Sequence, residues 1–143
     1  MKLMGIDYGR RRIGVAVTDE NGSSIRGLTT IDRQKRPDAI GTLMNIIQQE
    51  KPAALVFGLP LDINDADTVM SKEVREFADK LRISSKLPVN FVDESLTSKR
   101  AAELMRFRKK KERQDKAAID RLAACLILQS FCEGQGCNYS DSF

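Results

Sequence analysis

The chain has 143 residues, with 24 Lys and Arg against 20 Asp and Glu, and a formal net charge of +4. This length is typical of a single domain, and no apolar run reaches the ~18 residues that a membrane span requires. The chain contains no histidine, which excludes Ser-His-Asp triads, Cys-His pairs and HExxH zinc sites.

The first third of the chain predicts three antiparallel strands. Met1-Lys2 leads directly into a strand-like run without a signal-peptide pattern, so a cytoplasmic protein is expected. The segments Lys2–Tyr8 and Ile13–Thr18 are separated by GRRR at 9–12. This pattern indicates a hairpin, with Gly9 and Gly14 on either side of its turn. A third strand is expected at Ser24–Ile31 after a second turn.

The remainder of the chain alternates helices with strands. We expect helices from about Pro37 to Lys51, from the end of a loop at Leu59–Thr68 to about Ser84, after a Thr97 cap, and from about Lys116 to Phe131. Strands are expected at Ala53–Gly58 and Leu87–Val92. The helical spacing points two stripes inward, one of Val69, Val74, Phe77, Ala78 and Leu81 and one of Ile119, Leu122, Ala123, Leu126 and Ile127. This order indicates a mixed α/β sheet. Residues 1–133 are expected to form one domain and residues 134–143 a C-terminal tail.

Asp7 is an acidic residue within an otherwise apolar predicted strand, between Ile6 and Tyr8. Strand alternation places Asp7 on the same face as Leu3 and Gly5. An ionised carboxylate on a covered face is costly unless it is paired or bound to a metal. The alternative is that Asp7 lies at the strand end and pairs with a nearby arginine.

Two further acids close the predicted strand that ends at Val92. Alternation turns Asp93 to the face of Phe91 and Glu94 to the face of Val92, so only one of the two acids can reach Asp7. Acids are common at strand ends, so this pair alone is weak support for a site.

Asp120 lies in the first turns of the last helix, close to the small residues Ala123 and Ala124 on the helical wheel. These alanines leave space for the carboxylate and for a bound group. The alternative is an acid that only complements the helix dipole. Because no histidine is available, three carboxylates would select a hard cation such as Mg²⁺ or Mn²⁺. Two such ions can activate a water molecule and stabilise the leaving oxygen of a phosphodiester.

Two basic segments accompany these acids. Arg10, Arg11 and Arg12 follow Asp7 and would contact phosphates beside the scissile bond; the alternative is a solvated turn with weak surface ion pairs. Residues 106–116 carry seven basic and two acidic side chains. Lys109, Lys110, Lys111 and Arg113 in this segment are expected to bind nucleic-acid backbone without reading its sequence, although charge runs are often only solvated.

Four segments resemble one protein family in the same order along the chain. GIDYGRRRIGVAVTD at 5–19, VFGLPLDIN at 56–64, VDESLTSKRA at 92–101 and IDRLAACLILQSF at 119–131 are similar to motifs of the YqgF family of Holliday-junction-resolvase-like pre-16S rRNA nucleases. The resemblance implies an RNase H-like α/β fold, with a five-stranded mixed sheet of order 3-2-1-4-5 flanked by helices.

The resemblance also implies which residues act. The catalytic and metal-binding acids would be Asp7, Glu94 and Asp120, which selects Glu94 over Asp93, and Arg12 would be the phosphate-binding arginine of the first motif. Ser95 departs from the family, which usually has arginine there, and the loop at 62–68 lacks the usual glycine.

The expected function is therefore a divalent-metal-dependent endonuclease that leaves a 5′-phosphate. Its expected substrate is precursor 16S rRNA, cut at the 5′ end during ribosome maturation, and branched DNA of the Holliday-junction type is the alternative. A homodimer is a candidate assembly, and no membrane partner is expected. Two other classes are the alternatives to a nuclease: a sugar-kinase- or actin-like ATPase, which would need a second domain, and a non-catalytic nucleic-acid-binding protein.

Overall fold

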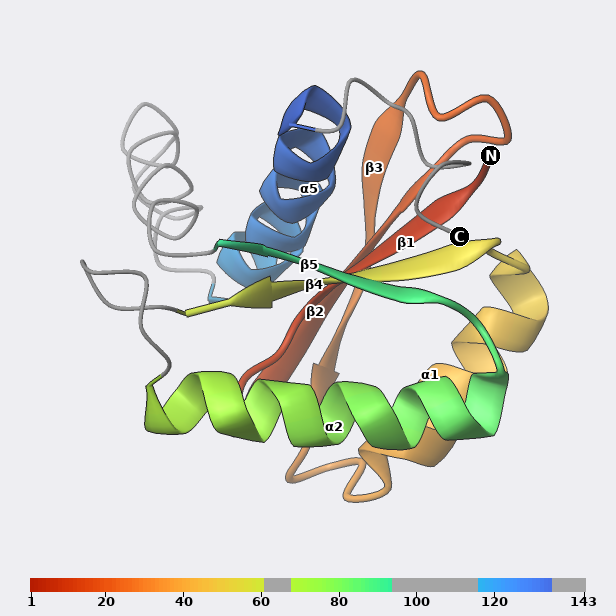
Figure 1. Cartoon of the computed structure of the whole chain (residues 1–143). Coiled ribbons are helices and arrows are strands. Elements are labelled where there is room, and N and C mark those ends of the chain that lie inside the picture. Colours follow the sequence, from red (N-terminus) through yellow and green to blue (C-terminus); the bar gives the residue numbers. More distant parts are fainter. Residues whose placement is uncertain (61–67, 94–115, 135–143) are drawn as a thin grey trace.

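The computed structural model describes residues 1–60, 68–93 and 116–134. Its sheet has five strands in the order β3-β2-β1-β4-β5, which confirms the predicted topology (Figure 1). The elements are, in chain order, β1 (Leu3–Asp7), β2 (Arg12–Thr18), β3 (Ile25–Asp32), α1 (Ala39–Glu50), β4 (Ala54–Leu59), α2 (Val69–Ser85), β5 (Val89–Asp93) and α5 (Lys116–Gly134). Strands β1, β2 and β3 are antiparallel neighbours, whereas β4 pairs in parallel with β1 and β5.

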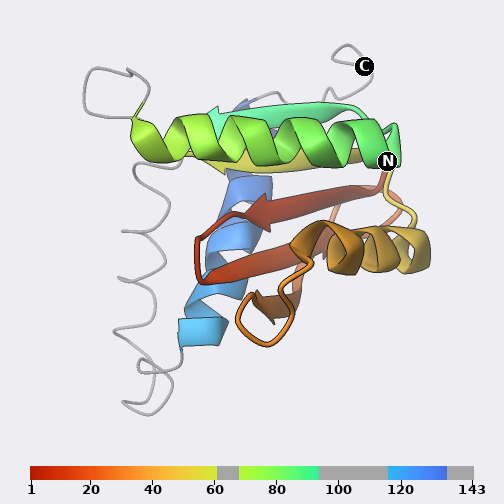
Figure 2. The ribbon, with the colours of Figure 1, turned by 90° about the horizontal axis from the view of Figure 1, so that it is seen from below.

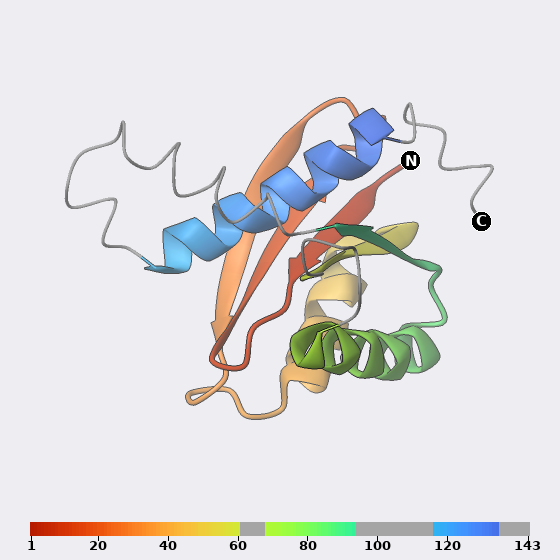
Figure 3. The ribbon, with the colours of Figure 1, turned by 60° about the vertical axis from the view of Figure 1, so that its left-hand side comes forward.

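Helices cover both faces of the sheet. Figures 2 and 3 show α5 on one face and α1 with α2 on the other. The α5 face is built around Leu3, Ala16 and Val56, against Ala124 and Leu128 of the helix. The opposite face carries bulkier strand residues and the buried side chains of α1 and α2; it includes Met4, Ile6, Ile13, Phe57, Leu43, Phe77 and Leu81.

Helix α1 begins two residues after the predicted Pro37 start. Asp38 is the N-cap, because its side chain accepts a hydrogen bond of 3.0 Å from the Gly41 N–H. The helix ends as expected, with Lys51 in the left-handed conformation as its C-cap.

Helix α2 begins with a capping box. The Thr68 side chain accepts from the Ser71 N–H, and the Ser71 hydroxyl accepts from the Thr68 N–H at 2.7 Å. The Thr68 hydroxyl also donates a 2.7 Å hydrogen bond to the carbonyl of Pro60, which joins the end of β4 to the start of α2. The prediction that Val69 points inward is wrong: its relative exposure is 74%, because it is the first helical residue and lies beyond the contact with the sheet.

Helix α5 extends to Gly134, so residue 134 belongs to the helix and not to a tail. Its buried side is also wider than the predicted stripe. Ala123, Leu126 and Ile127 are buried as expected, but Ile119 and Leu122 are only half-buried. Ala124 and Leu128 are fully buried instead, because α5 crosses the sheet from β3 to β5 and so presents more than one side.

Several predicted features lie outside the described residues: the loop at 61–67, Glu94, Ser95, the helix after Thr97, the basic segment up to residue 115, and residues 135–143. Within the part of the chain that the structure describes, no helix is long and apolar enough to cross a membrane.

Candidate active site

Asp7 is the last residue of β1 and is half-buried. Alternation along β1 carries Leu3, Gly5 and Asp7 on the face that α5 covers, since Leu3 and the α5 residue Leu128 belong to one buried cluster. In the sheet register Asp7 is paired with Gly14 of β2. The carboxylate therefore lies where the sheet meets the first half of α5.

Gly14 connects Asp7 to Asp120. A Cβ atom at Gly14 would overlap the carbonyl oxygen of Asp120, so the backbone of α5 rests directly on this glycine. One glycine is thus the register partner of Asp7 and the packing partner of Asp120, and the two acids are brought to one place. Gly14 lies inside β2, as the strand predicted at Ile13–Thr18 implies.

Gly5 makes a similar close contact about one helical turn further along α5. A Cβ there would lie 2.8 Å from the carbonyl oxygen of Ala124 and 2.6 Å from Cγ of Leu128. The alternation of Gly5 and Asp7 in the motif G-I-D could have indicated a close helix contact next to the acid.

Asp120 is held by Arg12. The Arg12 Nε donates a hydrogen bond of 2.8 Å to Oδ2 of Asp120, and the two side chains are 30% and 20% exposed. The predicted phosphate-binding arginine and a predicted metal ligand therefore contact each other in this structure. The partner of Arg12 in the β2–β3 register is Asp32.

The other arginines of the hairpin also face carboxylates. Arg10 pairs with Glu73 of α2 at 2.8 Å, and Arg11 lies 3.8 Å from Asp32. Both arginine side chains are more than half exposed, so these ion pairs contribute little to stability.

Arg33 supports the hairpin turn at residues 8–11, and sequence reasoning did not find it. Its backbone N–H donates to the Arg11 carbonyl at 2.9 Å, and its guanidinium donates to the Gly9 carbonyl at 3.1 Å. The same guanidinium lies 5.2 Å from the ring centre of Tyr8 and 5.7 Å from that of Phe77. No local sequence pattern predicts this contact, because it joins three separate elements.

Strand β5 ends at the same edge of the sheet as β1, because β1, β4 and β5 run parallel. Val92 packs with the α5 cluster, whereas Phe91 packs with the α1–α2 cluster. Asp93 is exposed and is the register partner of Leu59. Glu94, Lys109, Lys110, Lys111 and Arg113 lie outside the described residues, so their place in the site stays a prediction.

The chemistry of the donors suits a hard divalent cation. Asp7 and Asp120 offer carboxylate oxygens on one face of the sheet, which is the ligand type that Mg²⁺ and Mn²⁺ prefer. Across residues 1–60, 68–93 and 116–134, no group of three metal-ligating side chains gathers. The predicted third ligand, Glu94, is not among those residues.

A family model described as "RuvX: Holliday junction resolvase" matches residues 1–134. The chain belongs to the RuvX family. This assignment confirms the resemblance found in the four sequence motifs. It covers every described element of the fold, including the three that meet at Gly14.

Curated RuvX relatives match along nearly their whole length. A protein of Crocosphaera subtropica is 38% identical over 93% of this chain and 93% of its own. A protein of Oleidesulfovibrio alaskensis is 40% identical over 92% of this chain and 91% of its own. Both carry the name "Putative pre-16S rRNA nuclease".

Solved structures confirm the RNase H-like fold. RuvC of Thermus thermophilus in complex with a Holliday junction substrate superposes with a TM-score of 0.60 at 15% identity, over 95% of this chain and 97% of that chain. The fowlpox virus Holliday junction resolvase superposes with a TM-score of 0.56 at 10% identity, over 94% and 99% of the two chains. At these identities the likeness establishes the fold alone.

Proposed function

We propose that this RuvX protein is a divalent-metal-dependent nuclease that hydrolyses phosphodiester bonds. The observation that carries the proposal is the meeting of Asp7 and Asp120 across Gly14, at a hairpin lined by Arg10, Arg11 and Arg12. Carboxylates for a cation and guanidiniums for phosphates are the groups that this reaction requires.

Asp7 and Asp120 would hold the cation, with Glu94 as the third ligand. When bound, the metal supplies an activated nucleophile and neutralises charge on the leaving oxygen. Gly14 contributes by fixing the helix backbone against the strand, which keeps Asp120 beside Asp7. Rigid elements, and not loops, thus position both described acids.

Arg12 has two roles in this proposal. In the structure its guanidinium neutralises the Asp120 carboxylate at 2.8 Å. In the presence of substrate, Arg12 would leave Asp120 and donate to a phosphate oxygen next to the cleaved bond. Arginine suits this exchange because its planar group binds carboxylate and phosphate in the same way.

The proposed substrate is the 5′ end of precursor 16S rRNA. Support comes from the relatives, whose printed name refers to pre-16S rRNA and which share 38–40% identity with nearly the whole chain. Cleavage of four-way DNA junctions is the second candidate, and the family description "Holliday junction resolvase" favours it. Cytoplasmic location and a homodimer remain parts of the proposal.

The test is cleavage of an end-labelled precursor-rRNA fragment by the full chain in Mg²⁺ or Mn²⁺. Asp7→Asn should reduce the cleavage rate about a thousandfold, since loss of metal-assisted charge stabilisation is worth several kcal/mol. The matched control is Asp79→Asn, an exposed carboxylate of α2 that should cut like wild type. If Asp7→Asn cuts as fast as the control, the mechanism is wrong.

A four-way DNA junction and a matched linear duplex, assayed beside the RNA, separate the two substrate candidates. Faster cleavage of the junction than of the RNA would favour resolvase activity. RNA binding that chelation does not change, with no cleavage of any substrate, would favour the non-catalytic alternative. Lack of ATP binding in calorimetry would exclude the ATPase class.

A further inference from the structure

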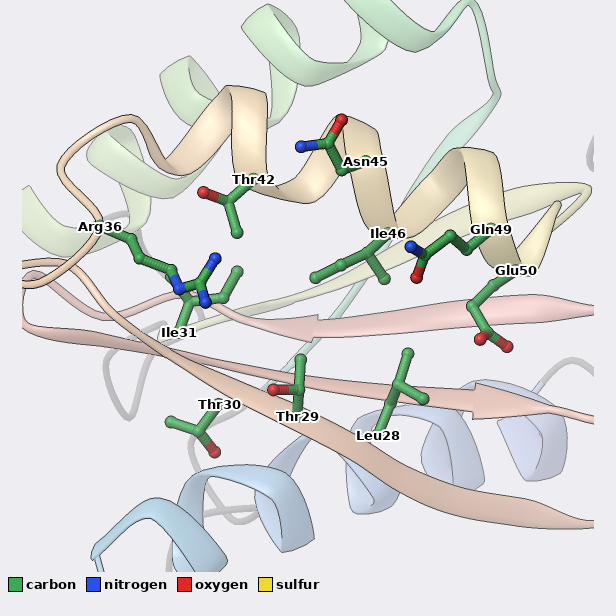
Figure 4. A pocket seen from close by; sticks show the side chains of 10 residues that line it. All are labelled: Leu28, Thr29, Thr30, Ile31, Arg36, Thr42, Asn45, Ile46, Gln49 and Glu50. Carbon is green, nitrogen blue, oxygen red and sulfur yellow. The ribbon is translucent and has the colours of Figure 1, made fainter.

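A groove of about 520 Å³ lies between the edge strand β3 and helix α1 (Figure 4). It opens on the face opposite to α5, since Ile31 in its wall belongs to the α1–α2 cluster. The proposed catalytic groups do not use it. Its volume lies within the range of ~300–1,000 Å³ that is typical of ligand sites.

Uncommitted polar groups line this groove. Asn45 and Gln49 lie one helical turn apart on α1 and line the groove, and Thr29 lines it from β3 (Figure 4). In the part of the chain that the structure describes, the side chains of these three residues make no hydrogen bond. Thr42 donates to the Asp38 carbonyl at 2.9 Å and keeps its acceptor capacity. Amide and hydroxyl groups of this kind match the donors and acceptors of ribose.

One end of the groove is cationic, and at the other end a carboxylate is neutralised by two ion pairs. Arg36 stands at the end near the hairpin, next to the exposed Lys35, and neither has an ion-pair partner among the described residues. Glu50 at the opposite end is held by Lys2 at 3.1 Å and Arg26 at 3.3 Å. A polyanion is therefore attracted to the end at Arg36, and at the other end the charge of Glu50 is balanced by Lys2 and Arg26.

The cationic end is joined to the hairpin of the candidate active site. The Asp32 carbonyl accepts from the N–H groups of Lys35 (3.1 Å) and Arg36 (2.9 Å), which sets the turn that carries both cations. The Arg33 N–H donates to the Arg11 carbonyl, so this turn and the hairpin lie against each other, as Figure 3 shows. Arg11 of the hairpin and the cations Lys35 and Arg36 of the turn thus lie at the same end of the sheet.

We propose that the β3–α1 groove is a second nucleic-acid subsite, which binds single-stranded ribonucleotides flanking the cleaved bond through phosphate contacts at Lys35 and Arg36 and ribose contacts at Asn45 and Gln49. This inference rests on the proposed nuclease function and specifies its substrate as RNA with an unpaired flank. The 2′-hydroxyl is the group by which amide side chains distinguish RNA from DNA. None of the described residues that line the groove is aromatic, so recognition is assigned to the sugar and phosphate rather than to stacked bases.

The test measures binding of a short fluorescent single-stranded RNA to the full chain by anisotropy, in EDTA so that cleavage does not interfere. Arg36→Ala and the double variant Asn45→Ala/Gln49→Ala should each weaken binding about tenfold, as loss of one or two net hydrogen bonds predicts. DNA of the same sequence should bind about fivefold more weakly than RNA to wild type, and the double variant should lose this preference.

Matched controls come from the same elements. Gln48→Ala on α1 lies outside the groove lining, and Lys80→Ala removes an exposed cation of α2; both should bind RNA like wild type. Thermal unfolding verifies that every variant is folded. Wild-type RNA affinity in both groove variants would overturn the proposal. It would favour instead an extended peptide along β3 as the ligand of the groove. Equal affinity of wild type for RNA and DNA would also overturn it. Neither result would touch the nuclease proposal, which the Asp7→Asn cleavage assay decides separately.

Discussion

The two faces of the sheet are built in opposite ways. Under α5 the strands present small residues, and Gly5 and Gly14 let the helix backbone touch the sheet. Under α1 and α2 the strands present bulky side chains such as Ile6 and Phe57, which keep the helices at side-chain distance. One face therefore fixes backbone positions, and the other buries most of the large apolar side chains.

This difference explains where function lies. Asp7 and Asp120 occupy the face whose geometry is set by contacts between backbones, where little side-chain rearrangement is available. The groove at the β3 margin occupies the other face, where α1 stands away from the edge strand. The acids are thus held on one face of the sheet, and the groove that could take a flexible ligand lies on the other.

The largest effect on stability is expected on the bulky face. Phe57→Ala should lower the free energy of unfolding by about 4 kcal/mol, because Phe57 is fully buried and touches Phe77 and Phe91. Urea unfolding measures this, with Ile83→Ala, 68% exposed on α2, as a control that should change less than about 0.5 kcal/mol. A similar value for both variants would contradict the contrast between the faces.

Gly14→Ala tests the tight face. The added methyl group would overlap the Asp120 carbonyl, and the forced shift of α5 should cost about 3 kcal/mol and also lower cleavage by moving Asp120. Gly134→Ala, where nothing lies within 4 Å, is the matched control and should be neutral or slightly stabilising. If Gly14→Ala unfolds like wild type, close backbone contact does not position the acid.

Arg12→Gln should have a small effect on stability and a larger one on ligands. Losing the half-exposed pair with Asp120 should cost about 1 kcal/mol or less in urea unfolding. Mn²⁺ affinity, measured by calorimetry without substrate, should rise, because Asp120 no longer has a competing cation. Weaker Mn²⁺ binding in this variant would mean that Arg12 supports the metal site instead of competing for it.

The smallest effect concerns Asp19, in the turn after β2. Hydrogen bonds from the backbone and side chain of Ser23, and then from Ser24, lower its pKa from 3.8 to about 2. A carboxyl whose folded pKa is lowered stabilises the fold above its unfolded pKa and loses that contribution as the pH falls through the folded value. The difference in stability between wild type and Asp19→Asn should therefore be present at pH 6 and shrink between about pH 4 and pH 2. A pH-independent difference would contradict this origin.

The sequence predicts the features that depend on periodicity. Alternation places Asp7 on its face, and the order of strands and helices leads to the sheet topology, because these patterns are local. The contact of Gly14 with α5 and the stacking of Arg33 on Tyr8 are set by tertiary packing and leave no local pattern. The pair of Arg12 with Asp120 joins residues 108 positions apart, so only the folded chain reveals it. The prediction for Val69 is wrong because helical spacing alone does not say where a helix leaves the sheet.

The hydrogen bond from the Thr68 hydroxyl to the Pro60 carbonyl holds the two ends of the connection between β4 and α2 together. Because both sides of that connection are tied, its length can change while the strand and the helix stay in place, and each doubling of length adds only about 0.6 kcal/mol in closure entropy. The separation of Pro60 and Thr68 therefore sets the span that any connection between the strand and the helix has to close.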